Sequence, residues 1–196
     1  MSMPEPLDRS LPEVLHEAHP FVVATWRASA SWNTTPDGRL APWMEPGLIE
    51  VRVAPARLER ALALMQAVIE TSSSRGLTLR PAERSRGWRS GIEIGQAETF
   101  TGIRVEEQRR LVRFEDIDLD NWRRSTVWSY REQEFRQRGH VPRADERLRV
   151  RLPRRHRDWP VARTSGWRTS FTDEHGRPLE LMIDAIVDEL AERAGC

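Results

Sequence analysis

The sequence contains no lysine, although 31 of its 196 residues are basic. All of those basic residues are arginine. This usage is typical of a genome rich in G and C, and arginine is also the side chain that recognises phosphate and carboxylate bidentately. The two interpretations do not exclude each other. Because 30 residues are acidic, the formal net charge is +1, which provides no general attraction to nucleic acid or to a membrane.

Cysteine is also scarce: the one thiol belongs to Cys196, the last residue. No intrachain disulfide can form, which is typical of a reducing compartment. No apolar run approaches the roughly 20 residues that a membrane-spanning helix needs. Residues 1–15 lack the basic and apolar regions of a signal peptide. We therefore expect a cytoplasmic protein with no membrane partner.

The common motifs for catalysis and cofactor binding are missing. The glycines form neither phosphate-loop pattern, and no G-x-S-x-G occurs. Of the five histidines, His16 and His19 could share a helix face with Glu13 or Glu17, but a metal there would need further ligands, so we expect no metal site. A site assembled in space, with His140 or His175 beside a carboxylate, stays open. We predict no cofactor, and the sequence favours a protein that is not an enzyme.

The clearest pattern is a strand–helix–strand unit over residues 48–80. Ile49, Val51 and Val53 alternate with two charged residues, which predicts a half-buried strand. Pro55 suits the first position of a helix, and apolar residues then recur every three or four positions. Gly76 suits the helix end, and residues 77–80 predict a second strand.

Further patterns predict the rest of the fold. We expect a helix within residues 19–32, a hairpin over 92–105, strands at 147–152 and 167–172, and a helix after Pro178. Residues 106–114 are ambiguous between helix and strand. The order predicts an α+β fold, a mostly antiparallel sheet with helices packed on one face. Residues 1–18 are expected to form a flexible arm, and 19–196 a single domain in which strands 49–53 and 147–152 share one sheet.

An arginine-rich segment is the strongest candidate for a site. Residues 143–163 contain eight arginines and three acids, a local net charge of +5. The two-residue period places alternate arginines of strand 147–152 on the sheet face opposite the core. Arginine contacts to phosphate, with a tryptophan available to stack on a base, would form a nucleic-acid surface. The candidate residues are Arg147, Arg149, Arg151, Arg154, Arg155, Arg157 and Trp159.

The same pattern also fits an ordinary solvated sheet face. In that interpretation the acids of the C-terminal helix, at positions 184, 188, 189 and 192, neutralise the arginines. The eight tryptophans suggest a further surface, because they exceed what one core of this size would fully bury. Trp122 and Trp128, which lie in a charged stretch, are candidates for a protein interface, although core packing also accounts for any single tryptophan.

Several segments resemble a family of uncharacterised bacterial proteins. They are residues 19–22, 37–40, 48–55 with the following helix, 166–168, and the C-terminal apolar stripe after Leu179. Many members carry an upstream helix-turn-helix-like segment, which implies DNA-associated or mobile-element roles. Residues 1–18 are too short and too rich in proline for such a segment, so the resemblance covers the accessory domain.

The sequence therefore favours a nucleic-acid-associated or regulatory binding module that uses the arginine-bearing sheet face. The expected partner is DNA or RNA. The alternative is a protein-interaction or assembly component of a bacterial complex, with another protein or a second copy of the chain as its partner.

Overall fold

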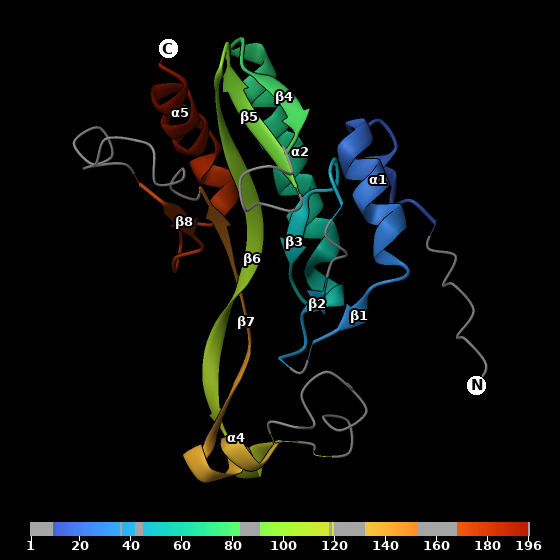
Figure 1. Cartoon of the computed structure of the whole chain (residues 1–196), viewed down its shortest axis with the longest axis vertical. Helices are drawn as coiled ribbons and strands as arrows, with labels where there is room; N and C mark the ends of the chain where they lie inside the picture. The colour runs from blue at the N-terminus through green and yellow to red at the C-terminus, as the bar shows by residue number, and fades with distance from the viewer. Residues whose placement is uncertain are drawn as a thin grey trace.

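The computed structural model describes residues 10–35, 37–41, 45–82, 91–117, 119, 132–152 and 168–195. Within these residues the chain has an α+β fold with a six-stranded sheet and a separate two-stranded sheet (Figure 1). The two-stranded sheet pairs β1 (Asn33–Thr34) with β2 (Leu40–Ala41) in antiparallel orientation. The predicted fold class is confirmed.

The predicted strand–helix–strand unit is present as β3 (Glu50–Arg52), α2 (Leu58–Ser74) and β4 (Thr78–Pro81). Pro55 begins a short 3-10 turn, Pro55–Arg57, and the α-helix follows it. Gly76 has a φ of 76°, the left-handed conformation that favours glycine after a helix. The two strands are not neighbours, because β3 pairs with β6 and β4 pairs with β5.

The central strand is β6 (Thr99–Arg113), which pairs with three others. It forms the predicted hairpin with β5 (Ile92–Gln96) and is parallel to β3. Its other edge pairs with β7 (His140–Arg151), which pairs in turn with β8 (Ser170–Thr172). The β3 strand and the arginine-bearing strand therefore share a sheet, as predicted, and residues 106–113 are strand.

The helices cover one face of this sheet. The C-terminal α5 (Ile183–Ala194), entered through the 3-10 helix Leu179–Met182, packs against α2, β5 and β6. The earlier helix α1 (Pro20–Ser29) packs against α2. Fully buried apolar residues from all layers meet in one core, among them Met65, Val105, Val150 and Ile186. This layering leaves the other sheet face for polar side chains.

The second half of the predicted flexible arm is packed. Leu15, in the 3-10 helix Glu13–Leu15, is fully buried in the core, and Leu11 and Ala18 pack against it. The His16 Nε2 atom lies 2.9 Å from the Leu11 carbonyl oxygen. Residues 11–18 therefore depart from that prediction, because three of their four apolar residues, Leu11, Leu15 and Ala18, find partners in the core, whereas Val14 is exposed. Residues 1–9 lie outside the described residues.

A smaller apolar cluster lies at the far end of the β6–β7 hairpin. It joins Phe114 and Ile117 to Val141 and to Phe135 of α4 (Glu132–Arg138), and the 3-10 helix Phe114–Asp116 links it to β6. In the part of the chain that the structure describes, no helix is long and apolar enough to cross a membrane.

Candidate functional site

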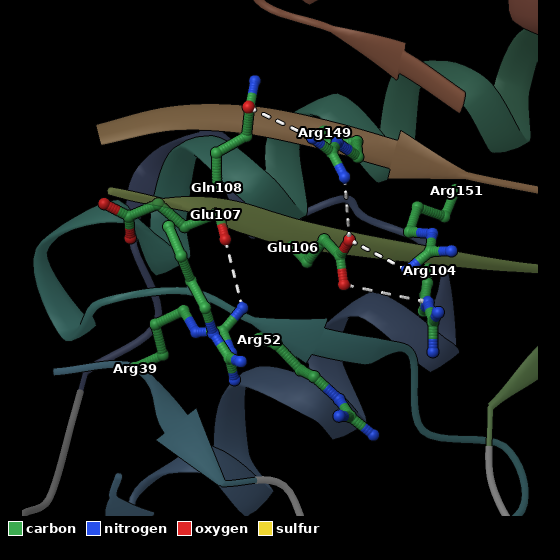
Figure 2. Close-up of a pocket in the computed structure, with 9 residues that line it drawn as sticks. Arg39, Arg52, Arg104, Glu106, Glu107, Gln108, Arg149 and Arg151 are labelled. Atoms are coloured by element: carbon green, nitrogen blue, oxygen red, sulfur yellow. Dashed lines mark hydrogen bonds and ion pairs between the residues drawn. The ribbon is translucent and has the colours of Figure 1, made fainter. Parts of the chain in front are cut away.

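A polar depression of about 370 Å³ lies on the sheet face that the helices leave uncovered (Figure 2). It is centred on β3, β6 and β7, the three strands that meet at the middle of the sheet. Its lining consists of charged and amide side chains: Arg39, Arg52, Arg104, Glu106, Glu107, Gln108, Arg109, Arg149 and Arg151.

Strand register places these side chains in two rows. Val51, Val105 and Val150 are paired across the three strands and point into the core, so the residues on either side of them point outward. One row reads Glu50, Arg104, Arg151 and the other reads Arg52, Glu106, Arg149. Arg104 thus lies directly opposite Arg151, an arrangement of like charges that destabilises a sheet unless an anion intervenes.

The anion that intervenes is the carboxylate of Glu106, which three arginines share. Its Oε1 lies 3.4 Å from Nη1 of Arg151 and 3.7 Å from Nη1 of Arg149. Its Oε2 lies 4.0 Å from Nε of Arg104. Figure 2 shows the Glu106 side chain between these guanidinium groups. One carboxylate therefore holds three cations from two strands, and it is 14% exposed.

The other end of the depression is organised by Asp37. Its Oδ2 lies 3.0 Å from Nη2 of Arg39 and 2.7 Å from Nε of Arg109, and its Oδ1 accepts a 2.5 Å hydrogen bond from the Thr35 hydroxyl. Burial raises the pKa of Asp37, but the hydrogen bond from Thr35 and the charge of Arg39 outweigh burial and lower it overall. Asp37 is therefore ionised at neutral pH.

The side chain of Glu107 stabilises the backbone beside the depression. Its carboxylate is buried and accepts 2.7 Å hydrogen bonds from the backbone N–H groups of Ala54 and Glu146. These bonds hold a β-bulge, where the β6–β7 register shifts and Glu146 has a φ of 60°. Its carbonyl oxygen accepts a 3.1 Å hydrogen bond from Nη1 of Arg39, which ties the β2 side of the depression to β6.

Arginine outnumbers acid in this depression. Six arginines line it, and the acids beside them are Glu106, Glu107, Asp37 and Glu50, which pairs with Arg52 at 2.8 Å. Within the described residues, the buried Nε atoms of Arg52 and Arg149 have no hydrogen-bond partner. Such buried donors are costly to leave unsatisfied. The arrangement is suited to binding an anion through several guanidinium groups.

The structure brings part of the predicted site together. Arg149 and Arg151 line the depression, as the alternation predicts. Arg147 does not line it, because its Nε donates a 2.9 Å hydrogen bond to Asp145 beside the bulge. Four predicted residues, Arg154, Arg155, Arg157 and Trp159, lie outside the described residues, as do Trp122 and Trp128.

For the strand residues Arg147, Arg149 and Arg151, the interpretation in which the C-terminal helix neutralises the arginine face is wrong. Helix α5 packs on the other side of the sheet, because its apolar stripe belongs to the core. Asp184 and Asp188 form ion pairs with Arg75, the residue that follows α2, and Glu189 pairs with Arg193 at 2.8 Å within α5. The acids that partly neutralise the arginine face come from β3 and β6.

Sequence reasoning missed Arg39, Arg52, Arg104 and Arg109. One signal was present: Arg52 occupies an outward position of a strand predicted to share a sheet with strand 147–152. Arg104 and Arg109 depended on the full extent of β6, whose residues from 106 to 110 are all polar and show no apolar alternation. Arg39 lies in the segment before β2, where no strand pattern was predicted.

Comparisons of the chain with protein-family models, with curated proteins and with solved structures found no match. The resemblance to a bacterial family stays a hypothesis, and the function is inferred from the geometry of the site.

Proposed function

We propose that this protein is a nucleic-acid-binding module that contacts the phosphate backbone through the arginine-bearing face of its sheet. The observation that carries the proposal is the sharing of Glu106 among Arg104, Arg149 and Arg151. Guanidinium groups in excess over carboxylates on one exposed face offer bidentate donors that match phosphate oxygens.

The spread of the arginines favours a polymer of phosphates over one small anion. The lining arginines come from β3, β6, β7 and the segment before β2. Arg52 and Arg104 turn toward Glu50, whereas Arg39 and Arg109 turn toward Asp37 at the other end. Positive groups distributed in this way suit successive phosphates along a strand, and such contacts position a nucleic acid without reading its sequence.

The double variant Arg149→Gln/Arg151→Gln is expected to weaken nucleic-acid binding roughly tenfold or more, because two charge-assisted contacts are lost. The slope of the logarithm of the binding constant against the logarithm of salt concentration should become shallower by about 1.8, because each lost phosphate contact contributes about 0.9 to that slope. Fluorescence anisotropy with a labelled 20-base-pair DNA and a single-stranded RNA, titrated at several salt concentrations, measures both quantities.

The matched control is Arg27→Gln/Arg75→Gln, which removes the same charge from the helices. Arg75 has the same side-chain exposure as Arg149, 33%, and Arg27 is exposed on α1. This control should bind like the wild-type protein. Equal losses in the two double variants would mean that net charge, and not the sheet face, determines binding. No binding by the wild-type protein at low salt and micromolar concentration would refute the proposal.

Replacing Glu106 with glutamine is expected to tighten binding by roughly threefold or more, because the carboxylate that competes with phosphate for three arginines is removed. The same anisotropy titration measures the change. Weaker binding by a Glu106→Gln variant with an unchanged circular dichroism spectrum would show that the carboxylate orients the arginines and does not compete for them.

The alternative is a protein-interaction or assembly component. One observation favours it: Leu111, on the β6–β7 hairpin, is 71% exposed, the highest value among the large apolar residues that the structure describes. Self-association in light scattering, together with no nucleic-acid binding in the titrations above, would favour this alternative.

A further inference from the structure

The carboxylate of Glu106 is held loosely by the arginines around it. Its three contacts with them measure 3.4, 3.7 and 4.0 Å, whereas a charge-assisted hydrogen bond from a guanidinium group measures about 2.7–2.9 Å. Other pairs beside the same depression reach that length, since Arg52 lies 2.8 Å from Glu50 and Arg109 lies 2.7 Å from Asp37. The guanidinium groups around Glu106 therefore keep the capacity to donate short bonds to a stronger acceptor.

Arg149 and Arg151 are the accessible members of this group. Their side chains are 33% and 42% exposed, and Glu106 is the one carboxylate among the described residues with which either forms an ion pair. Nη2 of Arg149 also donates a 3.1 Å hydrogen bond to Oε1 of Gln108. An amide orients the guanidinium group without neutralising its charge. Two cations at the surface thus share one loosely held anion.

Three guanidinium groups, those of Arg104, Arg149 and Arg151, converge on the position that Glu106 occupies (Figure 2). A phosphodiester within a strand carries one negative charge and leaves two oxygens unesterified. A phosphate monoester at the end of a strand offers three acceptor oxygens and a charge of about −1.5 to −2 at pH 7. The monoester therefore matches the three guanidinium groups in number and gains more from their charge.

The Asp37 end of the depression is built differently. There Arg39 and Arg109 contact the buried Asp37 carboxylate at 3.0 and 2.7 Å, so their guanidinium groups are already held by short contacts. The Arg109 side chain is nevertheless 47% exposed and can approach a further phosphate. The two ends of the depression are thus suited to different groups, and the loosely held arginines lie only at the Glu106 end.

On these observations, and resting on the proposed function, we propose that the Glu106 end of the depression binds the phosphate monoester at the end of a nucleic-acid strand. The phosphate replaces the Glu106 carboxylate as the acceptor of short bonds from Arg149 and Arg151. The depression, at about 370 Å³, lies within the range of sites that hold small molecules, roughly 300–1,000 Å³, so it can take a terminal nucleotide. The rest of the strand continues toward the Asp37 end.

The test uses the duplex DNA and the single-stranded RNA of the binding titrations, labelled at an internal base. Each is prepared with a 5′-phosphate, with a 3′-phosphate, and with hydroxyl groups at both ends. In anisotropy titrations with the full chain, one phosphorylated form is expected to bind roughly tenfold or more tightly than the hydroxyl-ended form, because hydrogen bonds to a charged group are gained. Inorganic phosphate should abolish this preference, whereas chloride at the same ionic strength should not.

The variant Arg151→Gln is expected to bind the phosphorylated and hydroxyl-ended forms within about threefold of each other, because one of the converging guanidinium groups is lost. The matched control is Arg109→Gln, which removes the same charge from the other end of the depression. The exposed fractions of the two side chains are similar, 42% for Arg151 and 47% for Arg109. The control should weaken the binding of all forms and keep the preference for the phosphorylated end.

Equal binding of the three forms, or a preference that persists in a folded Arg151→Gln variant, would overturn this inference and leave the proposed function intact. A preference lost equally in Arg151→Gln and Arg109→Gln would overturn the placement of the end phosphate at Glu106. If Arg151→Gln does not fold, the comparison of the three forms and the competition by inorganic phosphate still decide the inference, because both use the wild-type protein. No nucleic-acid binding by the wild-type protein would overturn both proposals.

Discussion

Replacing Gly95 with alanine is expected to lower the free energy of unfolding by roughly 3 kcal/mol or more, the upper range for overpacking. A Cβ atom on Gly95 would lie 2.0 Å from the Thr99 carbonyl oxygen and 2.7 Å from the Phe100 Cα. Neither atom belongs to a side chain that can rotate away, so the backbone of β5 or β6 must move.

That backbone is held on both sides. Gly95 pairs with Phe100 of β6 and with Thr78 of β4, whose hydroxyl donates a 3.1 Å hydrogen bond to the Gly95 carbonyl oxygen. A shift of β5 would therefore disturb two strand pairs at once. Urea denaturation followed by circular dichroism measures the loss for Gly95→Ala.

Gly76→Ala is the matched control. Gly76 has a φ of 76°, and a Cβ there would meet no atom within 4 Å. Its replacement should cost about 1–2 kcal/mol, the conformational penalty of the left-handed region alone. A Gly95→Ala variant no less stable than Gly76→Ala would contradict the close approach of β5 and β6 described above.

Replacing Asp173 with asparagine is expected to cost about 3 kcal/mol at pH 7, because a buried carboxylate that joins three elements loses its charge. Its Oδ1 accepts 2.9 Å hydrogen bonds from the Leu179 N–H and from Nη2 of Arg60. Its Oδ2 accepts 2.8 Å bonds from the Leu148 N–H and from Nη1 of Arg60. The NH₂ group of an asparagine would replace one carboxylate oxygen and would face a backbone N–H and an Arg60 N–H, neither of which can accept a hydrogen bond. The contacts that join α2, β7 and the start of the C-terminal helix would therefore be weaker.

The cost should depend on pH. Burial raises the pKa of Asp173, but hydrogen bonds from Arg60 and from the backbone of Leu148 and Leu179 outweigh burial and lower it overall. A carboxyl with a lowered folded-state pKa stabilises the fold above its unfolded pKa of about 3.9, and the contribution disappears as pH falls through the folded value. The difference in stability between wild type and Asp173→Asn should therefore be full at pH 7 and shrink below about pH 4.

Glu174→Gln is the control for this change, because Glu174 is the adjacent acid and is exposed. Its replacement should alter stability by less than about 0.5 kcal/mol at any pH tested. A stability difference for Asp173→Asn that stays constant from pH 7 to pH 3.5 would show that the cost comes from shape and not from the lost charge.

The accuracy of the sequence predictions depended on how regular each element is. The unit of β3, α2 and β4 was predictable because apolar residues repeat at two-residue and then at three- to four-residue steps, and Gly76 ends the helix. The outward direction of Arg149 and Arg151 followed from the same two-residue period. Arg147 departs from the predicted set because a bulge, which no local pattern announces, lies beside it.

The sequence by itself determined the β3–α2–β4 unit, the C-terminal helix and the sheet face of residues in the regularly alternating strands, because those properties follow from local period. Only the tertiary structure decided that β6 lies between β3 and β7. That neighbourhood places Glu106 among Arg104, Arg149 and Arg151 and puts Arg110 opposite Arg143. The physical reason is that period specifies the direction of a side chain, whereas its neighbours depend on strand order and register, which long-range packing of the core determines.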